Sequence, residues 1–203
     1  MILLKKLADF AKIRESNLSE EHESMAIQIF ILSKLMEENT YPYKLKKKLS
    51  EPIPLDRLGG LTESKLYYHF DVLVRQGLIE PVKIIKEENR PDKQVFAITN
   101  KGREVLPKKI YSLFEKADTI SEMTAGIASI HYAERDKVIE ILERKRERIL
   151  KQWDQIKYFE SKLQVTEGNK SLVEFIGSYI SHEKDERLYW IDALAERIRA
   201  REL

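Results

Sequence analysis

Cysteine is absent from the chain, and glycine (7 residues) and proline (6 residues) are scarce among its 203 residues. The absence of cysteine excludes disulfides, thiolate metal sites and cysteine nucleophiles, and fits a reducing cytoplasm. No run of about 18 apolar residues occurs, and the start, Met1 to Leu7, is interrupted by Lys5 and Lys6. We therefore expect a cytoplasmic protein that is neither exported nor membrane-spanning.

Charged residues make up 34% of the chain and hydrophobic residues 42%, which is typical of a soluble, helix-rich protein. The charges are unevenly distributed. Residues 41–116 hold 16 Lys and Arg against 10 Asp and Glu, whereas residues 118–203 hold 15 against 17. A basic surplus confined to one segment is the electrostatic footprint expected for binding a polyanion.

The stretch from Leu61 to Ile79 combines a helix start, a polar-aromatic face and an apolar face. Thr62 is placed to act as the N-cap, and Gly77 is placed to end the helix. Leu66, Phe70 and Leu73 recur at helical spacing and predict a face that docks on a core. The opposite face is predicted to be exposed and to carry hydrogen-bonding and cationic groups that reach bases or phosphates: Ser64, Lys65, Tyr67, Tyr68, His69 and Arg75.

The neighbouring segments complete a recognisable order of elements. A buried helix is predicted from Ser19 to about Glu38, a short helix from Tyr43 to Leu49, and extended runs at 78–85 and 95–98 separated by a charged, flexible segment at 86–93. Thr99 is predicted to cap a further helix, which Pro107 weakens or shortens. Three helices and a hairpin in this order predict a winged helix-turn-helix domain.

The helix within Leu61 to Ile79 is the predicted recognition helix. Outside it, two lysines of the short helix, Lys44 and Lys47, are candidate phosphate contacts, although a charge run can equally keep a helix face solvated. Arg90 and Lys93, at the expected tip of the wing, are candidates for phosphate or minor-groove contact. Together with Thr62 and the six polar and aromatic residues of the exposed helix face, they form the predicted DNA-binding set.

After Ala117 the pattern changes to long amphipathic helices. Thr119 with Glu122, and Ser171 with Glu174, have the spacing of capping boxes. Helices are predicted from Glu134 to about Leu163 and from Ser171 to about Arg201, with apolar residues along one seam of each. A helix of roughly 30 residues is about 45 Å long and needs partners, which favours an antiparallel hairpin that also pairs with a second chain. The predicted dimerisation residues are Leu142, Ile149, Trp153, Ile156, Ile176, Tyr179, Trp190 and Leu194.

Several short motifs resemble those of a known family. They are Tyr41-Pro-Tyr-Lys-Leu45, the Leu66-Tyr67 pair, Leu73 with Gly77-Leu-Ile79, and Arg90-Pro-x-Lys93 leading to Phe96-x-Ile98-Thr99-x-x-Gly102-Arg103. Over roughly 25–107 the chain resembles the PadR-like transcriptional regulators. The resemblance implies a homodimer that binds operator DNA, usually as a repressor, with a helical C-terminal region for dimerisation and sometimes for an effector. The Tyr67-Tyr68-His69 element also resembles the recognition helix of arsenic-sensor-type and multidrug-resistance-type winged-helix repressors.

Other function classes have weaker support. No Gly-rich phosphate loop and no Ser-His-Asp constellation is evident, so we expect no enzyme and no cofactor. The only histidine with helical i,i+4 spacing to an acid, His182 with Glu186, is more typical of a surface ion pair than of a metal site. Trp153 and Trp190 could line a pocket for a small-molecule effector, although packing at a helix interface explains them equally simply.

The sequence therefore predicts a mainly α-helical protein with a β-hairpin wing. The expected domains are an N-terminal extension (1–21), a winged helix-turn-helix domain (22–117) and a helical dimerisation domain (118–203). The expected function is that of a homodimeric regulator, acting as a repressor, that binds a palindromic site on double-stranded DNA. A winged-helix protein-interaction module, or a nonspecific DNA-binding protein of an assembly, is the alternative.

Overall fold

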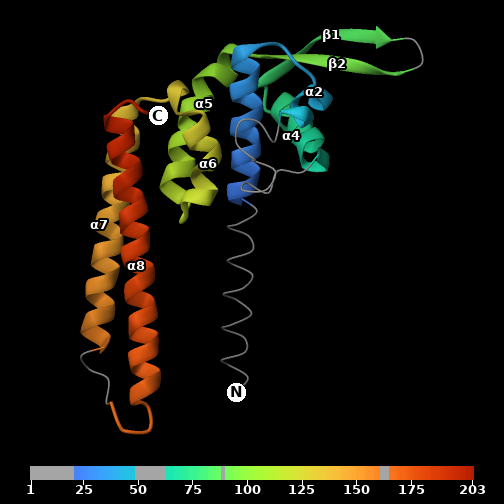
Figure 1. The fold of residues 1–203 in the computed structure, drawn as a ribbon. Helices are drawn as coiled ribbons and strands as arrows, with labels where there is room; N and C mark the ends of the chain where they lie inside the picture. Colours follow the sequence, from blue (N-terminus) through green and yellow to red (C-terminus); the bar gives the residue numbers. More distant parts are fainter. Residues whose placement is uncertain (1–20, 49–62, 88–89, 161–164) are drawn as a thin grey trace. The chain divides into compact units, whose positions relative to one another are not determined.

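The computed structural model describes residues 21–48, 63–87, 90–160 and 165–203 (Figure 1). The chain divides into two compact units, Met1–Glu134 and Arg135–Leu203. The predicted fold class is confirmed, since the described residues are mainly helical with one antiparallel hairpin. No helix among them is both long and apolar enough to cross a membrane.

A helix over residues 21–37 is the most deeply buried element of the first unit. Ile29, Ile31 and Leu32 are completely inaccessible to solvent, and Leu35 is nearly so. Because apolar residues cover most of its circumference, this helix packs against neighbours on several sides. Its predicted end near Glu38 is confirmed, whereas the predicted start at Ser19 lies outside the described residues.

Helix α2 (Pro42–Lys47) follows after a short extended link. Pro42 occupies the first turn, where its fixed φ favours the helix and its missing N–H costs nothing. The buried side chain of Leu45 anchors the helix. The predicted helix over Tyr43 to Leu49 is thus found, but it ends at Lys47. Lys48 is its C-cap, and Leu49 lies outside the described residues.

Helix α4 (Glu63–Arg75) ends in the turn that its sequence predicts. Gly77 has a φ of +68°, the left-handed conformation that favours glycine. The amide of Leu78 donates to the carbonyl of Leu73 at 2.9 Å, and that of Gly77 donates to Val74 at 2.9 Å. These two bonds form a Schellman motif, which satisfies the last carbonyls of α4 and directs the chain into the hairpin.

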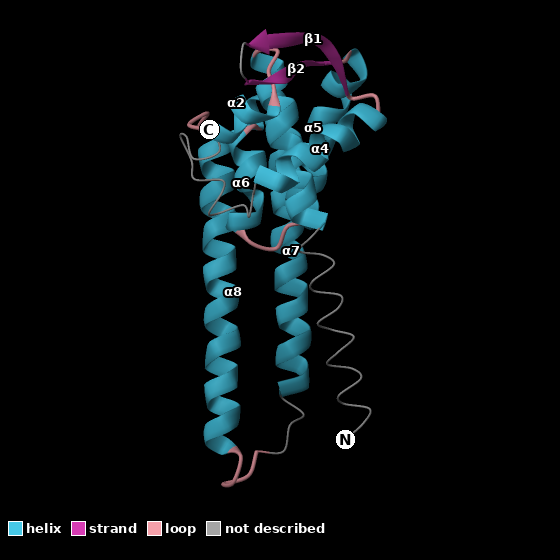
Figure 2. Ribbon diagram, turned by 90° about the vertical axis from the view of Figure 1, so that its right-hand side faces the viewer, coloured by secondary structure: helices cyan, strands magenta, loops and turns pink. Residues whose placement is uncertain are grey.

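The wing consists of β1 (Ile79–Glu87) and β2 (Arg90–Ile98), drawn in magenta in Figure 2. They pair antiparallel from Ile79 opposite Ile98 to Glu87 opposite Arg90. The prediction that residues 86–93 form a flexible separator is therefore wrong for most of that segment. Backbone hydrogen bonds hold a two-stranded ribbon even where charged side chains leave it in solvent, so burial pattern alone underestimates strand length.

Helix α5 (Asn100–Lys116) is tied to the end of α4 by its N-cap. The Thr99 hydroxyl accepts from the amide of Gly102 at 3.0 Å and donates to the carbonyl of Gly77 at 2.8 Å. The predicted shortening by Pro107 is wrong, because α5 continues to Lys116 with Leu106, Ile110 and Leu113 fully buried. Burial of this apolar face outweighs the loss of one helical hydrogen bond.

Helix α6 (Ile120–Ala128) begins with the predicted capping box between Thr119 and Glu122, and the short 3-10 helix η1 (Ile130–Tyr132) follows. In the second unit, α7 (Arg135–Glu160) and α8 (Lys170–Arg199) pack side by side as an antiparallel hairpin (Figure 1). Val138, Leu142 and Ile198 are buried between them. An ion pair of 3.0 Å between Arg146 and Asp192, and another between Arg199 and Glu143, flank this core.

The predicted capping box of Ser171 and Glu174 is wrong. Helix α8 begins at Lys170 with Asn169 as its N-cap, so Ser171 already lies within the first turn. The side-chain oxygen of Asn169 accepts from the backbone amide of Thr166 at 2.7 Å. It therefore closes the preceding turn instead of capping the helix, a local hydrogen bond to which asparagine is well suited.

The close approach of α5 to the hairpin predicts which glycine is essential. A Cβ on Gly102 would overlap the Leu78 carbonyl and lie 2.7 Å from Cγ1 of Ile98. We expect Gly102→Ala to lower the free energy of unfolding by about 1–3 kcal/mol or more, as overpacking does. Gly168→Ala, whose Cβ would meet nothing nearer than 4.0 Å, is the control and should change stability little. Equal stability of the two variants in urea denaturation would contradict this packing.

Candidate nucleic-acid interface

Helix α4 is fixed by its apolar side. Leu66, Phe70 and Leu73 are at most 1% exposed, and the ring of Phe70 lies 5.1 Å from that of Phe96 on β2. Helix α2 and strand β1 also contact α4. Because this side is held on three elements, the orientation of the opposite side toward solvent is determined by packing.

The opposite side of α4 exposes two large aromatic residues. Tyr67 is 44% and Tyr68 59% exposed, and Ser64, Asp71 and Arg75 are exposed with them. Exposed tyrosines pair a flat apolar ring with a hydroxyl that can donate to phosphate or to a base edge. This side of the helix, with Lys65, is called the α4 face below.

Lys65 is exposed but not unpartnered. Its ammonium forms an ion pair with the carboxylate of Glu23 on the helix over 21–37. An exposed pair of this kind contributes only about 0–1 kcal/mol, so a phosphate can displace the carboxylate at small cost.

His69 does not belong to the α4 face, and the prediction that its ring is exposed is wrong. It is 5% exposed, with Nδ1 3.3 Å from the side-chain nitrogen of Gln28. The Lys109 ammonium donates to the other end of that amide, Oε1, at 2.7 Å. Since the nitrogen of Gln28 can only donate, Nδ1 of His69 must accept, which requires a neutral imidazole.

The surroundings of His69 favour that neutral form. Burial lowers the pKa of the imidazole below 6.5, Glu23 opposes this effect, and Lys109 and Lys65 add to it. Burial likewise lowers the pKa of the Lys109 ammonium. Burial therefore disfavours the charged forms of both His69 and Lys109. The Gln28–His69–Lys109 network supports α4 on its buried side.

The lysines of α2 lie beside acidic and aromatic neighbours. Lys44 is 2.7 Å and Lys48 3.0 Å from the carboxylate of Glu38, whose pKa their hydrogen bonds lower. The Lys47 ammonium lies 5.2 Å from the centre of the Tyr43 ring. The lysines of this segment therefore keep a cationic surplus, since the single carboxylate of Glu38 serves both Lys44 and Lys48.

The remaining predicted DNA contacts lie on the wing or outside the described residues. Lys93 does not lie at a loop tip, because it pairs with Ile85 within the wing and its ammonium is 5.6 Å from the centre of the Tyr41 ring. Arg90 begins β2 opposite Glu87, and Thr62 lies outside the described residues. Asp71 was not among the predicted contacts, although its spacing of four and three residues from Tyr67 and Tyr68 puts it on the same side of the helix.

The predicted dimerisation residues fall into two groups. Leu142, Ile149 and Leu194 are buried within the α7–α8 hairpin. Trp153 is half-buried, and the ammonium groups of Lys184 and Lys157 lie 4.5 and 5.6 Å from the centre of its ring. The exposed group consists of Ile156, Ile176, Tyr179 and Trp190.

Residues 31–108 match the model of the Transcriptional regulator PadR-like family. This segment includes α2, α4, the wing and the first half of α5. This part of the chain is therefore similar to the PadR-like family of transcriptional regulators. The family consists of regulators, not enzymes, and the predicted resemblance is confirmed.

Solved PadR-type structures show weak overall similarity to this chain. A PadR family regulator from Clostridium difficile is 24% identical over 41% of this chain and 81% of its own, with a TM-score of 0.34. Bacillus subtilis PadR in complex with operator DNA is 12% identical over 84% of this chain and 98% of its own, with a TM-score of 0.36. Bacillus subtilis PadR in complex with p-coumaric acid is 12% identical over 87% of this chain and 97% of its own, with a TM-score of 0.33. No curated protein matches. The similarity to the family rests on residues 31–108.

Among the residues that the structure describes, no three His, Asp or Glu side chains form a group that could hold a metal ion. The α4 face and its neighbours instead present hydroxyl, ammonium and guanidinium groups, which suit contact with a nucleic acid.

The buried His69 predicts a pH dependence of stability. A histidine whose pKa is lowered in the folded state binds fewer protons there than in the unfolded chain at acidic pH. The free energy of unfolding should therefore fall as the pH drops from about 7.5 to about 5.5, and His69→Gln should show a smaller fall. The exposed His182 offers the matched variant His182→Gln, which should keep the wild-type dependence in urea denaturation. Identical pH dependence in all three proteins would contradict the role of His69.

Proposed function

We propose that the protein is a homodimeric, sequence-specific DNA-binding regulator that acts as a repressor, with α4 as its recognition helix. The observation that carries this proposal is the α4 face, which exposes Tyr67, Tyr68 and Arg75 on a helix otherwise fixed by burial, within a PadR-like segment. The net charge of +6 over 41–116 supports it, because this surplus attracts the phosphate backbone.

The α4 face offers distinct chemical groups for the two kinds of DNA contact. The Tyr67 and Ser64 hydroxyls and Arg75 suit phosphate and sugar, while Lys65 and Tyr68 suit base edges in the major groove. The carboxylate of Asp71 can accept from the amino group of cytosine. Thr62, Lys44, Lys47, Arg90 and Lys93 stay in the proposal as flanking contacts.

A second copy of the chain is the proposed partner of the α7–α8 hairpin. Phe175 is 72% and Tyr179 61% exposed, and Leu172 and Ile176 lie on the same apolar stripe of α8. Trp190, which is 47% exposed, lies further along the helix beyond Glu183 and Glu186. Monomeric proteins rarely leave contiguous apolar surface of this kind in water. A dimer would carry two recognition helices and would match a palindromic operator with half-sites about 10 bp, or a multiple of that, apart. As a regulator of DNA, the protein is proposed to act in the cytoplasm.

The DNA-binding proposal predicts that substitutions of Lys65 and of its partner Glu23 have opposite effects on DNA affinity. Tyr67→Ala and Lys65→Ala should each raise the Kd for a selected operator duplex by roughly tenfold, about 1.4 kcal/mol. Glu23→Gln should lower it, because the Lys65 ammonium loses its competing carboxylate.

Fluorescence anisotropy with labelled duplex measures these effects. Lys108→Ala, which removes an exposed charge from α5, is the charge-matched control for Lys65→Ala and should change affinity little. Affinity that is unchanged by Tyr67→Ala and Lys65→Ala would refute the recognition-helix assignment. Binding with neither salt dependence nor sequence preference would instead favour a protein-interaction module.

The dimer proposal predicts that one charge on α8 separates the protomers. Phe175→Glu should raise the dimer dissociation constant at least tenfold in sedimentation equilibrium, because a carboxylate would have to be buried at the interface. Ser178→Glu, an exposed position three residues further along α8, is the matched control and should dimerise more tightly than Phe175→Glu. A monomeric wild type, or equal dimerisation of both variants, would contradict this interface.

A further inference from the structure

The buried His69 belongs to a cluster of charged and polar groups that joins three elements of the first unit. Its Nδ1 lies 3.3 Å from the amide nitrogen of Gln28, on the helix over 21–37, and Gln28 in turn accepts from Lys109 of α5 at 2.7 Å. One turn earlier on α4, Lys65 is paired with Glu23 of the helix over 21–37. Since residues four apart lie on one side of a helix, Lys65 and His69 face the same neighbouring helix.

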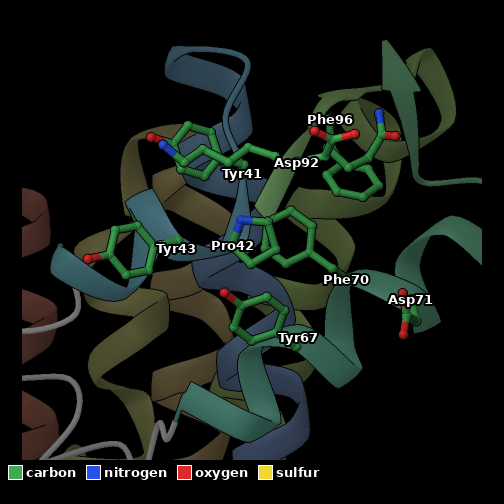
Figure 3. Close-up of a pocket in the computed structure, with 10 residues that line it drawn as sticks. Tyr41, Pro42, Tyr43, Tyr67, Phe70, Asp71, Asp92 and Phe96 are labelled. Carbon is green, nitrogen blue, oxygen red and sulfur yellow. The ribbon is translucent and has the colours of Figure 1, made fainter. Parts of the chain in front are cut away.

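A different side of α4 faces a hollow. This aromatic cavity lies between α2, α4 and β2 (Figure 3), and its lining includes Tyr41, Tyr43, Tyr67, Phe70, Asp71 and Phe96. The buried Phe70 ring forms its floor. By helical spacing, Tyr67 and Asp71 lie on another side of α4 from Lys65 and His69. A proton on His69 therefore acts on Lys65 and not on the cavity.

The orientation of the Gln28 amide is determined by Lys109. An ammonium group only donates hydrogen bonds, so the atom that faces Lys109 must be Oε1, and the amide nitrogen then faces His69. Nδ1 of a protonated imidazole also donates, and here it would meet a second donor. The amide cannot turn to accept from it without presenting its N–H groups to Lys109. Gln28 is therefore no acceptor for a charged His69 while Lys109 holds Oε1.

Glu23 is the group of this cluster that favours a charged His69. Burial is the main cause that lowers the pKa of the imidazole, Glu23 raises that pKa, and Lys109 and Lys65 lower it. The Glu23 carboxylate is held by Lys65 in an exposed ion pair. Exposed pairs of this kind are weak, so a new charge on His69 can draw the carboxylate away from Lys65.

We propose that His69 and Glu23 make the DNA contact of Lys65 depend on protons. When the imidazole binds a proton, the Glu23 carboxylate pairs with His69 instead of Lys65, and the Lys65 ammonium is released for contact with DNA. By linkage, DNA that takes Lys65 from Glu23 favours a proton on His69. Acidification thus strengthens DNA binding through this cluster. The effect on DNA rests on the proposed function, whereas the coupling of His69 to Lys65 does not.

NMR titration of the His69 ring measures the coupling in the full chain without DNA. Glu23→Gln should lower the pKa of His69, because the imidazolium loses its acceptor. Lys65→Met should raise it by roughly half a unit or more, because Glu23 is then left to His69. Lys108→Met removes an exposed ammonium from α5 and is the control, with no shift expected. No shift in either cluster variant, or shifts of opposite sign, would overturn the proposal.

The double variant separates a transfer of the carboxylate from simple repulsion between Lys65 and His69. If Lys65 acts through Glu23, Lys65→Met should shift the pKa of His69 much less in a Glu23→Gln background than in the wild type. If the two cations only repel each other, the shift is the same in both backgrounds. An equal shift would therefore refute the exchange of partners.

Fluorescence anisotropy at about pH 7.5 and about pH 5.5 tests the consequence for DNA. Acidification should strengthen binding of a selected operator duplex by the wild type roughly threefold more than binding by His69→Gln or Lys65→Ala. His131→Gln, which removes an exposed histidine from the same unit, is the matched control and should keep the wild-type dependence. Equal pH dependence in the wild type and His69→Gln would refute the regulation. Absence of DNA binding by the wild type at both pH values would refute the proposed function and leave the NMR titration standing.

Discussion

The attachment of α4 through Leu66, Phe70 and Leu73 is the constraint on which the rest of the first unit depends. It fixes which side of the helix faces solvent, positions Phe70 as the floor of the aromatic cavity, and brings His69 against Gln28. The Schellman turn at Gly77 and the Thr99 cap then join α4 to the wing and to α5. Binding surface, cavity and buried network therefore share one structural support.

Acidic neighbours moderate the cationic groups proposed to contact DNA. Lys65 is paired with Glu23, and Lys44 shares Glu38 with Lys48. Such exposed pairs are weak, so they lower the affinity for any polyanion without preventing contact. In the proposed function this balance favours sequence preference over nonspecific attraction, because phosphate contact alone gains less.

Much of the fold follows from sequence, since caps, glycine turns and helical periodicity are local signals. Thr99, Thr119 and Gly77 act as predicted. The errors have non-local causes. Wing length depends on cross-strand hydrogen bonds of charged residues, and α5 continues through Pro107 because of burial. His69 is the exception, because its spacing of three residues from Leu66 and four from Leu73 already puts it on the buried side of α4. Only its partners, Gln28 and Lys109, are distant in sequence. The aromatic cavity joins residues from three elements, and no spacing along the chain reveals it.

The central claim is that α4 and the wing read a particular DNA sequence. Selection of bound fragments from a pool of genomic DNA, followed by sequencing, tests it most directly. We expect enrichment of a shared palindromic motif whose half-sites lie about 10 bp, or a multiple of that, apart. A bound pool with the same sequence composition as the input, recovered equally by the wild type and by Tyr67→Ala, would contradict it.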